Sequence, residues 1–363
     1  MNVVEATREF ERWLSGQIEV VRDQLTEKHV RMAASPVEFL RGTFYRWAQC
    51  LPENCPDFSG VPSVLAIGDL HIASFGTWRD EFGRLVWGID DFDETCRLPY
   101  ANDLIRLAVS AVLDAREGEL KVDIKNVCDV VLDGYRSSLA QGGRVLVLEE
   151  RHKWLRKIAL EHLDKPATFW KKLDGLPTAH AALPNGARVA LERVLPERGI
   201  DYRIARRTSG LGSLGHPRFV AIFDWEGAQL AFETKQMAPS AWTWAHPDAV
   251  KAIHYDEAID CSVRCKDPFV RVIGKWLVRH LSPDSSPIEI ESMSALKEQE
   301  RLLHAMAWEA ANIHLGSKPE IRSVAEDLKT RSAKSWRRAV QQMVKTTLVD
   351  WRHWKRVRKA RKN

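Results

Sequence analysis

The sequence predicts an α+β protein with a mainly helical large lobe and a small antiparallel β lobe. Apolar residues recur at helical spacing in 3–31, 102–115 and 296–315. Between the last two segments, RFVAIF (218–223) and QLAFET (229–234) are β-type runs joined by the turn DWEG. A chain of 363 residues is long for one simple domain, and we therefore expect two lobes.

Further elements follow from the same periodicities and from the positions of Pro and Gly. We expect strands at 63–67, 84–89 and 275–281, and helices at 123–140, 148–163, 186–194 and 247–263. The predicted organisation is an N-terminal helical segment (1–60), a helical lobe (61–200), a β lobe (201–290), a return to the helical lobe (291–330) and a basic tail (331–363).

Charge and cysteine content exclude several classes of protein. The net charge of +5 is set by the tail 331–363, where twelve Lys and Arg accompany a single acid, Asp350, so the rest of the chain is net negative. Six cysteines are too few for a disulfide framework, and their spacing does not match a zinc site. The absence of a long apolar run and of a secretory signal predicts a soluble, cytoplasmic protein.

Two acidic motifs each come directly after a predicted strand. In IGDLH, Asp69 lies where the strand 63–67 gives way to a loop. In GIDDFDE, four acids occupy five positions, and Mg²⁺ prefers such carboxylate oxygens as ligands. Taken alone, Asp69 is equally well explained as a turn residue, and the acidic cluster as a solvated loop.

A glycine-rich stretch, SGLGSLG, lies before the predicted hairpin. Gly210, Gly212 and Gly215 fit G-x-G-x-x-G, but Pro217 and a strand follow where a dinucleotide-binding fold needs a helix. Glu233 has the spacing of an NAD-binding acid, but it falls in the second hairpin strand, which is the wrong topology. A glycine loop between antiparallel strands is instead the arrangement with which protein kinases cover ATP phosphates.

A kinase-like interpretation predicts two further residues. A lysine is expected on the next strand, and QLAFETK ends in Lys235. A glutamate on the following helix is expected to hold that lysine, and Glu257 is the candidate. Lys235, Glu257 and the loop that contains Ser213 are thus the predicted ATP-binding residues.

The acidic motifs supply the remaining roles of such a site. Asp69 is the predicted catalytic base, which accepts the proton of a substrate hydroxyl. Asp91, together with Asp93 or Asp90, is predicted to bind Mg²⁺. The sequence therefore predicts a phosphotransferase that uses Mg-ATP, with no indication of which acceptor it modifies.

The first motif resembles the catalytic loop of aminoglycoside and choline kinases. The ordered set of motifs is similar to a bacterial family known only as domain of unknown function 2252, which is placed among kinase-like folds. The similarity covers roughly residues 60–316, and its motifs lie at 68–76, 90–94, 102–108, 210–215, 267–269 and 307–315. The resemblance implies supporting roles for His71, Asp103 and Arg106, with Asp103 bracing the catalytic loop from below.

Two residues and the order of the motifs depart from these patterns. Ser74 stands where the family has an Asn in the catalytic loop, and its hydroxyl is a weaker ligand for the predicted metal. Asp90 replaces another Asn and adds negative charge to that site. The catalytic and metal motifs precede the glycine loop and Lys235, and this order predicts a circularly permuted two-lobe kinase-like fold.

Alternatives to an active kinase stay open at this point. Ser74 is compatible with a nucleotide-binding pseudokinase, and the same scaffold is compatible with transfer of AMP. A metallophosphoesterase also begins with Gly-Asp-x-His, but the further histidine motifs that it requires are missing.

The basic tail suggests a second kind of partner. Trp351 and Trp354 alternate with Lys and Arg over 351–363, a composition compatible with weak contact to nucleic acid or to an anionic surface. A solvated helix end explains the same residues. The expected partners are therefore a nucleotide, an acceptor of unidentified class and, through the tail, a polyanion.

Overall fold

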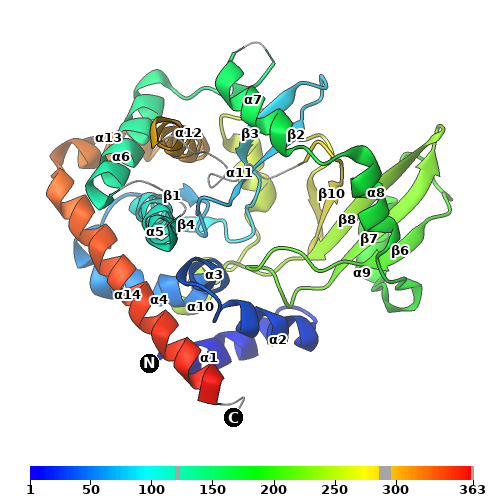
Figure 1. Cartoon of the computed structure of the whole chain (residues 1–363), viewed down its shortest axis with the longest axis horizontal. Helices are drawn as coiled ribbons and strands as arrows, with labels where there is room; N and C mark the ends of the chain where they lie inside the picture. Colours follow the sequence, from blue (N-terminus) through cyan, green and yellow to red (C-terminus); the bar gives the residue numbers. More distant parts are fainter. Residues whose placement is uncertain (119–122, 150, 286–295, 361–363) are drawn as a thin grey trace.

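The computed structural model describes residues 1–118, 123–149, 151–285 and 296–360 (Figure 1). A helical body lies on one side of the molecule and a five-stranded antiparallel sheet on the other. Two smaller antiparallel sheets are set into the helical body. These features confirm the predicted α+β class.

The five-stranded sheet contains the predicted hairpin. Its strands are β6 (Arg203–Arg206), β7 (Arg218–Trp225), β8 (Ala228–Gln236), β9 (Arg271–Ile273) and β10 (Trp276–His280), in the spatial order β6-β7-β8-β10-β9. The β7–β8 turn has positive φ at Glu226 (49°) and Gly227 (85°), which suits a two-residue hairpin turn. Helix α9 (Asn185–Glu192) packs on one face of the sheet, and α8 (Pro166–Asp174) packs on the other.

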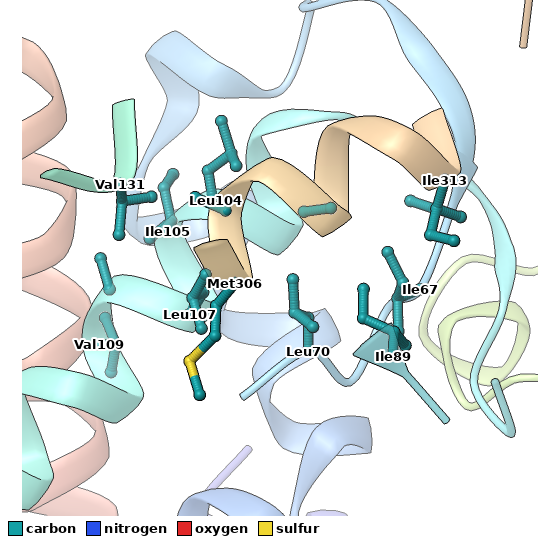
Figure 2. Packing of buried hydrophobic residues seen from close by; sticks show 14 of the residues in the cluster. Ile67, Leu70, Ile89, Leu104, Ile105, Leu107, Val109, Val131, Met306 and Ile313 are labelled. Atoms are coloured by element: carbon teal, nitrogen blue, oxygen red, sulfur yellow. The ribbon is translucent and has the colours of Figure 1, made fainter. Parts of the chain in front are cut away.

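The helical body is built around a shared apolar core. Helices α5 (Ala101–Glu117), α6 (Ile124–Gln141) and α12 (Leu296–His314) pack together, and α14 (Ala333–Ala360) lies across α5 and α6. Figure 2 shows Leu104, Leu107 and Met306 from these helices beside Ile67, Leu70 and Ile89 from the loops and strands of the site. The same core therefore fixes both the helices and the segments that carry the two acidic motifs.

The smaller sheets place the acidic motifs. Strand β1 (Ser63–Ala66) pairs with β4 (Cys96–Pro99), while β2 (Phe75–Arg79) pairs with β3 (Leu85–Ile89), and β3 with β5 (Leu146–Val147). The first motif connects β1 to β2, and the second connects β3 to β4. Because β1 and β4 are neighbours, the two motifs emerge side by side.

The remaining helices surround these units. They are α1 (Val3–Ser15), α2 (Arg22–Arg31), α3 (Pro36–Gly42), α4 (Phe44–Asn54), η1 (Pro56–Phe58), α7 (Lys153–His162), η2 (His180–Ala182), α10 (Trp242–Ala245), α11 (Tyr255–Cys261) and α13 (Ile321–Thr330). Within the described ranges, no helix combines the length and the apolarity that crossing a membrane demands.

Three sequence-based boundaries were wrong. The helix expected at 3–31 is instead two helices, separated at 16–21. At this break the Val21 N–H bonds the carbonyl oxygen of Gly215, in the loop between β6 and β7, at 2.8 Å. The helix expected at 247–263 shortens to α11. Pro247 follows α10 closely, and Ala249 and Ile253 pack on the core from a loop instead.

The third difference concerns the segment expected to be helical at 148–163, of which residue 150 lies outside the described residues. Helix α7 begins only at Lys153, because the Leu148 N–H donates to the carbonyl oxygen of Leu85 and extends the small sheet.

The segment expected to be a basic tail is a long helix that packs on the rest of the protein. Its described part belongs to α14, in which Trp336, Val340 and Trp354 are buried.

Candidate functional site

A cavity of about 720 Å³ is lined by both the five-stranded sheet and the helical body. Several residues of each predicted motif line it. They are Asp69, His71, Asp90, Asp91, Asp93, Gly210, Gly212, Ser213 and Lys235. Segments far apart in the sequence thus meet at one place, whereas Ser74, Gly215 and Glu257 lie outside this lining.

Asp69 lies in a sharp turn directly after β1. Gly68 has a φ of +81°, and a Cβ there would lie 2.4 Å from the carbonyl oxygen of Glu94, so only glycine fits. The buried carboxylate of Asp103 accepts hydrogen bonds from the backbone N–H groups of Ile67 (2.8 Å) and Gly68 (2.9 Å). Asp103 therefore fixes the backbone that presents Asp69.

Asp103 is itself held by a buried chain of polar groups. His314 Nε2 lies 2.9 Å from Asp103 Oδ2, and Tyr135 Oη lies 2.7 Å from His314 Nδ1. The Asn102 side chain donates to the carbonyl oxygen of Gly68 at 2.9 Å. The turn is thus anchored from α5, α6 and α12 together, and the position of Asp69 depends on the helical core.

Arg106 is the direct partner of the Asp69 carboxylate. Its Nε donates to Asp69 Oδ1 at 2.8 Å, and its Nη2 contacts the same oxygen. The guanidinium is fully buried between the rings of Phe44 and Trp47. Burial raises the pKa of Asp69 above its usual range although Arg106 opposes that change, so the carboxylate is more basic than a solvated one.

His71 and Ser74 stabilise the loop through hydrogen bonds to each other and to its backbone. Ser74 is buried, and its hydroxyl bonds His71 Nδ1 (3.1 Å) and the carbonyl oxygen of Asp69 (3.3 Å). Burial, together with Arg41 and Arg106, holds the pKa of His71 well below its usual range, so the imidazole is neutral. The structure does not bring Ser74 to the acidic cluster as an open ligand.

The acidic cluster faces Lys235 across the cavity. Lys235 Nζ contacts both carboxylate oxygens of Asp93, and only 8% of the lysine side chain is exposed. Asp90 and Asp91 are accessible inside the cavity. Burial and the nearby Asp93 raise the pKa of Asp91 to about 7. Among the described residues, Asp91 forms no ion pair with a basic side chain, although the charge of Lys235 acts on it.

Glu94 completes the acidic segment from the other side. Its carboxylate accepts hydrogen bonds from Ser240 Oγ (2.9 Å) and from the Ala241 N–H (2.6 Å). Burial raises its pKa to about 7 despite these bonds. Glu94 lines a second, small cavity of about 40 Å³. Asp69, Phe10 and Trp13 line the same cavity.

The glycine-rich loop joins β6 to β7 and lies close to Asp69. A Cβ on Gly212 would lie 3.6 Å from Asp69 Oδ2 and 3.4 Å from the carbonyl oxygen of Arg41, so a larger side chain would fill this gap. Gly215 has a φ of +103°, and a Cβ there would lie 2.6 Å from a methyl of Leu25. Glycines thus allow the loop backbone to approach both the carboxylate and the N-terminal helices.

An N-terminal strap, residues 17–28, holds this loop. Lys28 is buried and its Nζ donates to the carbonyl oxygen of Gly212 at 2.7 Å. Gln24 accepts from the Gly215 N–H at 3.2 Å and donates to Thr208 at 3.3 Å. Sequence reasoning missed the strap, because polar residues on a short helix look like a solvated face.

Glu257 does not occupy its expected place. It lies on α11 with an exposed side chain, and it contacts Arg97 Nη2 at 3.0 Å and His254 Nδ1 at 2.6 Å. The carboxylate that holds Lys235 is Asp93, which comes from the acidic cluster. The buried carboxylate next to Lys235 along β8 is Glu233, which contacts three arginines.

The metal site predicted from the sequence is only partly assembled by the protein. Throughout the described part of the chain, no group of three or more His, Cys, Asp or Glu side chains is arranged to hold a metal ion. Asp91 and Asp93 are close enough to affect each other's ionisation, and Lys235 neutralises one of them. Of this pair, Asp91 is accessible and Asp93 is shared with the lysine.

Comparison with known protein families gives a match for part of the chain. Residues 20–169 match the model of a family described as an uncharacterized protein conserved in bacteria, DUF2252. This segment includes both acidic motifs and ends before the five-stranded sheet. No curated protein matches the chain. No solved structure matches it either.

Proposed function

We propose that this protein is a kinase-like phosphotransferase that uses Mg-ATP to phosphorylate a hydroxyl group. The observation that carries the proposal is the ion pair between Lys235 and Asp93, beside Asp69 and under the glycine-rich loop. A protein kinase needs the same four parts: a loop over the phosphates, a lysine on the third strand of the sheet, a metal-binding aspartate and a catalytic aspartate. Here the sheet places the glycine loop between its first two strands and Lys235 on the third.

The residues fit Mg²⁺ bound together with a nucleotide. Mg²⁺ is commonly held by one or two carboxylates, and water and phosphate oxygens fill the other positions. Asp91 and Asp93 offer that pair, and a cation would stabilise the ionised form of Asp91, which burial and the nearby Asp93 disfavour. When bound, the metal supplies charge neutralisation for the transferred phosphoryl group.

The chain's own residues divide the remaining work. Lys235 orients the phosphates, and the backbone of 210–215 covers them. Asp69 accepts the hydroxyl proton of the acceptor, and its raised pKa favours that role. Arg106 and Asp103 hold Asp69 in place. The lobes are reached in permuted order, helical body first and sheet second, and this order is part of the proposal.

A nucleotide-binding pseudokinase is the second candidate. Its support is that Arg106 occupies one oxygen of Asp69 and that Ser74 is engaged within the loop. AMP transfer would use the same nucleotide site with another phosphorus attacked. A metallophosphoesterase has less support, because His71 Nδ1 already accepts a hydrogen bond from the Ala73 N–H.

The test measures Mg²⁺-dependent ATP binding and turnover in wild type, Asp69→Ala and Lys235→Ala. Lys266→Ala is the matched control, because this exposed lysine pairs with Asp260 outside the cavity. We expect Lys235→Ala to weaken binding about tenfold or more, and Asp69→Ala to keep binding but lose turnover by about 10²-fold. Wild-type binding without turnover, unchanged in Asp69→Ala, would support the pseudokinase. Binding and turnover untouched by both substitutions would refute the assignment.

A further inference from the structure

Three arginines converge on one buried carboxylate beside the candidate site. Glu233 is 2% exposed, and its oxygens contact Arg207 Nη1, Arg218 Nη1 (2.5 Å) and Arg279 Nε (3.0 Å). Arg218 is buried, whereas Arg207 and Arg279 are 27% and 32% exposed. All three arginines line the cavity that contains Asp69 and Lys235.

The charges of this cluster do not balance. Burial alone would raise the pKa of Glu233, but the three arginines hold it well below its usual range, so the carboxylate is ionised. One negative charge therefore faces three positive ones. Among the described residues, no second carboxylate forms an ion pair with Arg207 or Arg279. The cluster presents an excess of two positive charges to the cavity.

The sheet register aligns these charges. Arg218 on β7 is opposite Lys235 on β8, and Glu233 on β8 is opposite Arg279 on β10. Residues 233 and 235 share one face of the strand, so all four side chains lie on the same face of the sheet. The positive surface thus runs across three strands and ends at Lys235.

The cluster is tied directly to the glycine-rich loop. Arg218 Nη2 donates to Ser213 Oγ at 2.8 Å, and Arg207 lies at the start of the loop, where its N–H bonds the carbonyl oxygen of Arg218. A phosphate chain covered by this loop would lie within reach of guanidinium groups that can bind two phosphate oxygens at once.

We propose that Arg207, Arg218 and Arg279 form a polyphosphate subsite, additional to Lys235, that binds the phosphates of a nucleoside triphosphate. The inference rests on the proposed function for the identity of the ligand as a nucleotide. The lining of the same cavity includes Asp90 and Asp91, so it carries charges of both signs. Such a cavity matches a ligand that combines a polyanion with a divalent cation.

The test uses titration calorimetry of the full chain with inorganic tripolyphosphate, ATP and adenosine, each with Mg²⁺. Arg207→Gln and Arg279→Gln are the test variants. Arg206→Gln is the matched control, because this neighbour is exposed, stacks on Phe219 and lies outside the cavity lining. We expect each test variant to weaken tripolyphosphate and ATP binding about tenfold, with adenosine binding and the control unchanged.

The outcomes separate this inference from the proposed function. If ATP binding depends on Lys235 but is equal in wild type, Arg207→Gln and Arg279→Gln, the subsite is refuted and the phosphotransferase stands. If tripolyphosphate binds through the arginines but ATP does not bind, the subsite stands and the nucleotide assignment fails. If wild type binds neither ligand, both fail.

A structural role for the arginines predicts a different result. In that case thermal melting shows destabilised variants, while their folded fraction binds tripolyphosphate with wild-type affinity, which overturns the proposal. Arg279→Lys keeps the charge and loses the forked geometry, so we expect partial recovery of affinity relative to Arg279→Gln. Glu233→Gln removes the one compensating charge, and a variant that stays folded is expected to bind tripolyphosphate more tightly than wild type.

Discussion

Lys235 and Asp93 form an ion pair that joins the third strand of the five-stranded sheet to the acidic segment between β3 and β4, 142 residues away. Both ends of the pair are largely removed from water, with 8% and 19% of their side chains exposed. In the proposed function, Lys235 binds phosphate and Asp93 binds Mg²⁺. The ion pair therefore lies where the proposed function brings a cation and an anion together.

The first prediction concerns the strength of this pair. Lys235→Met leaves the Asp93 carboxylate without its partner, and we expect a loss of about 1–3 kcal/mol in the free energy of unfolding. The double variant Lys235→Met/Asp93→Asn is expected to lose less than the sum of the two single changes. Urea unfolding measures this cycle, and additive losses would contradict a direct coupling. The exposed pair Lys266–Asp260 is the control, with Lys266→Met expected to cost less than about 1 kcal/mol.

The second prediction concerns the support beneath Asp69. Asp103→Ala leaves the buried N–H groups of Ile67 and Gly68 and the His314 side chain without their acceptor. Each orphaned group costs about 1–3 kcal/mol, so we expect a loss of roughly 3–5 kcal/mol in the free energy of unfolding. Asp129→Ala is the control, because its pair with Arg337 is partly exposed and contributes less than about 1 kcal/mol. Equal losses in the two variants would show that Asp103 does not anchor the turn.

Local patterns were sufficient to predict much of this architecture. The β7–β8 hairpin and α5 follow from runs of neighbouring residues, and their predicted bounds differ from the structure by a few residues. The turn at Asp69 could also be predicted, because a Gly-Asp pair after an apolar run is typical of a strand end. The sequence did not predict which partner each charged side chain contacts.

The partner of a charged side chain depends on contacts between segments that are distant in the sequence. Several differences between the predicted and the observed site have this cause. Glu257 was expected to hold Lys235, but the sheet register and the acidic loop bring Asp93 there instead. Glu233 and its arginines are spread over three strands, so no short motif contains them. In each case the residue type was visible and the neighbour was not.

The third prediction concerns the basic helix α14. Trp354 is 4% exposed, packs with Val3, Met32 and Phe39, and donates from Nε1 to the carbonyl oxygen of His29 at 3.1 Å. Trp354→Ala is therefore expected to cost about 3–5 kcal/mol, whereas Val349→Ala, at an exposed position of the same helix, stays within about 0.5 kcal/mol. Thermal or urea unfolding of the two variants measures this difference in stability.

This burial changes how binding of a polyanion by the tail must be tested. Deleting 351–363, of which 361–363 lie outside the described residues, also removes Trp354 and with it a packing contact. Substituting the exposed Arg352, Lys355, Arg356 and Lys359 by Gln removes charge and leaves Trp354 in place, and the contact of Lys355 with the Trp351 ring is lost with it. If this helix contacts nucleic acid, we expect the charge variant to melt like wild type and to lose salt-sensitive binding.

The fourth prediction concerns pH. Burial raises the pKa of Glu309 to about 8, and Arg264 and a hydrogen bond from Asn312 only partly oppose this. Between the ordinary pKa of a glutamate and pH 8, the folded state holds a proton that the unfolded state has released. This group therefore lowers stability as pH rises through that window, with a slope of at most about 1.4 kcal/mol per pH unit. Glu309→Gln is expected to gain stability relative to wild type from pH 5.5 to 8.5, measured by urea unfolding. A constant difference across that range would contradict the raised pKa.

The fifth prediction concerns the N-terminal strap, which holds the glycine-rich loop through Lys28 and Gln24. Lys28→Met removes the donor to the carbonyl oxygen of Gly212 and keeps an apolar chain of similar length in the buried space. We expect the amides of 209–216 to exchange with deuterium about fivefold to tenfold faster, because one buried hydrogen bond of about 1–1.4 kcal/mol no longer opposes local opening. Arg22→Ala, at an exposed position of the same helix, is expected to leave this exchange unchanged.

In the proposed function, the contacts of the strap set how readily the loop lifts from Asp69. Gly212 lies against Asp69 Oδ2, so in this arrangement the loop occupies space that a hydroxyl acceptor needs. If the loop must lift for the acceptor to enter, Lys28→Met raises the rate of acceptor entry while ATP affinity falls or stays constant. Unchanged exchange in both Lys28→Met and Gln24→Ala would mean that packing of Leu25 against Gly215, rather than the polar contacts, keeps the loop down.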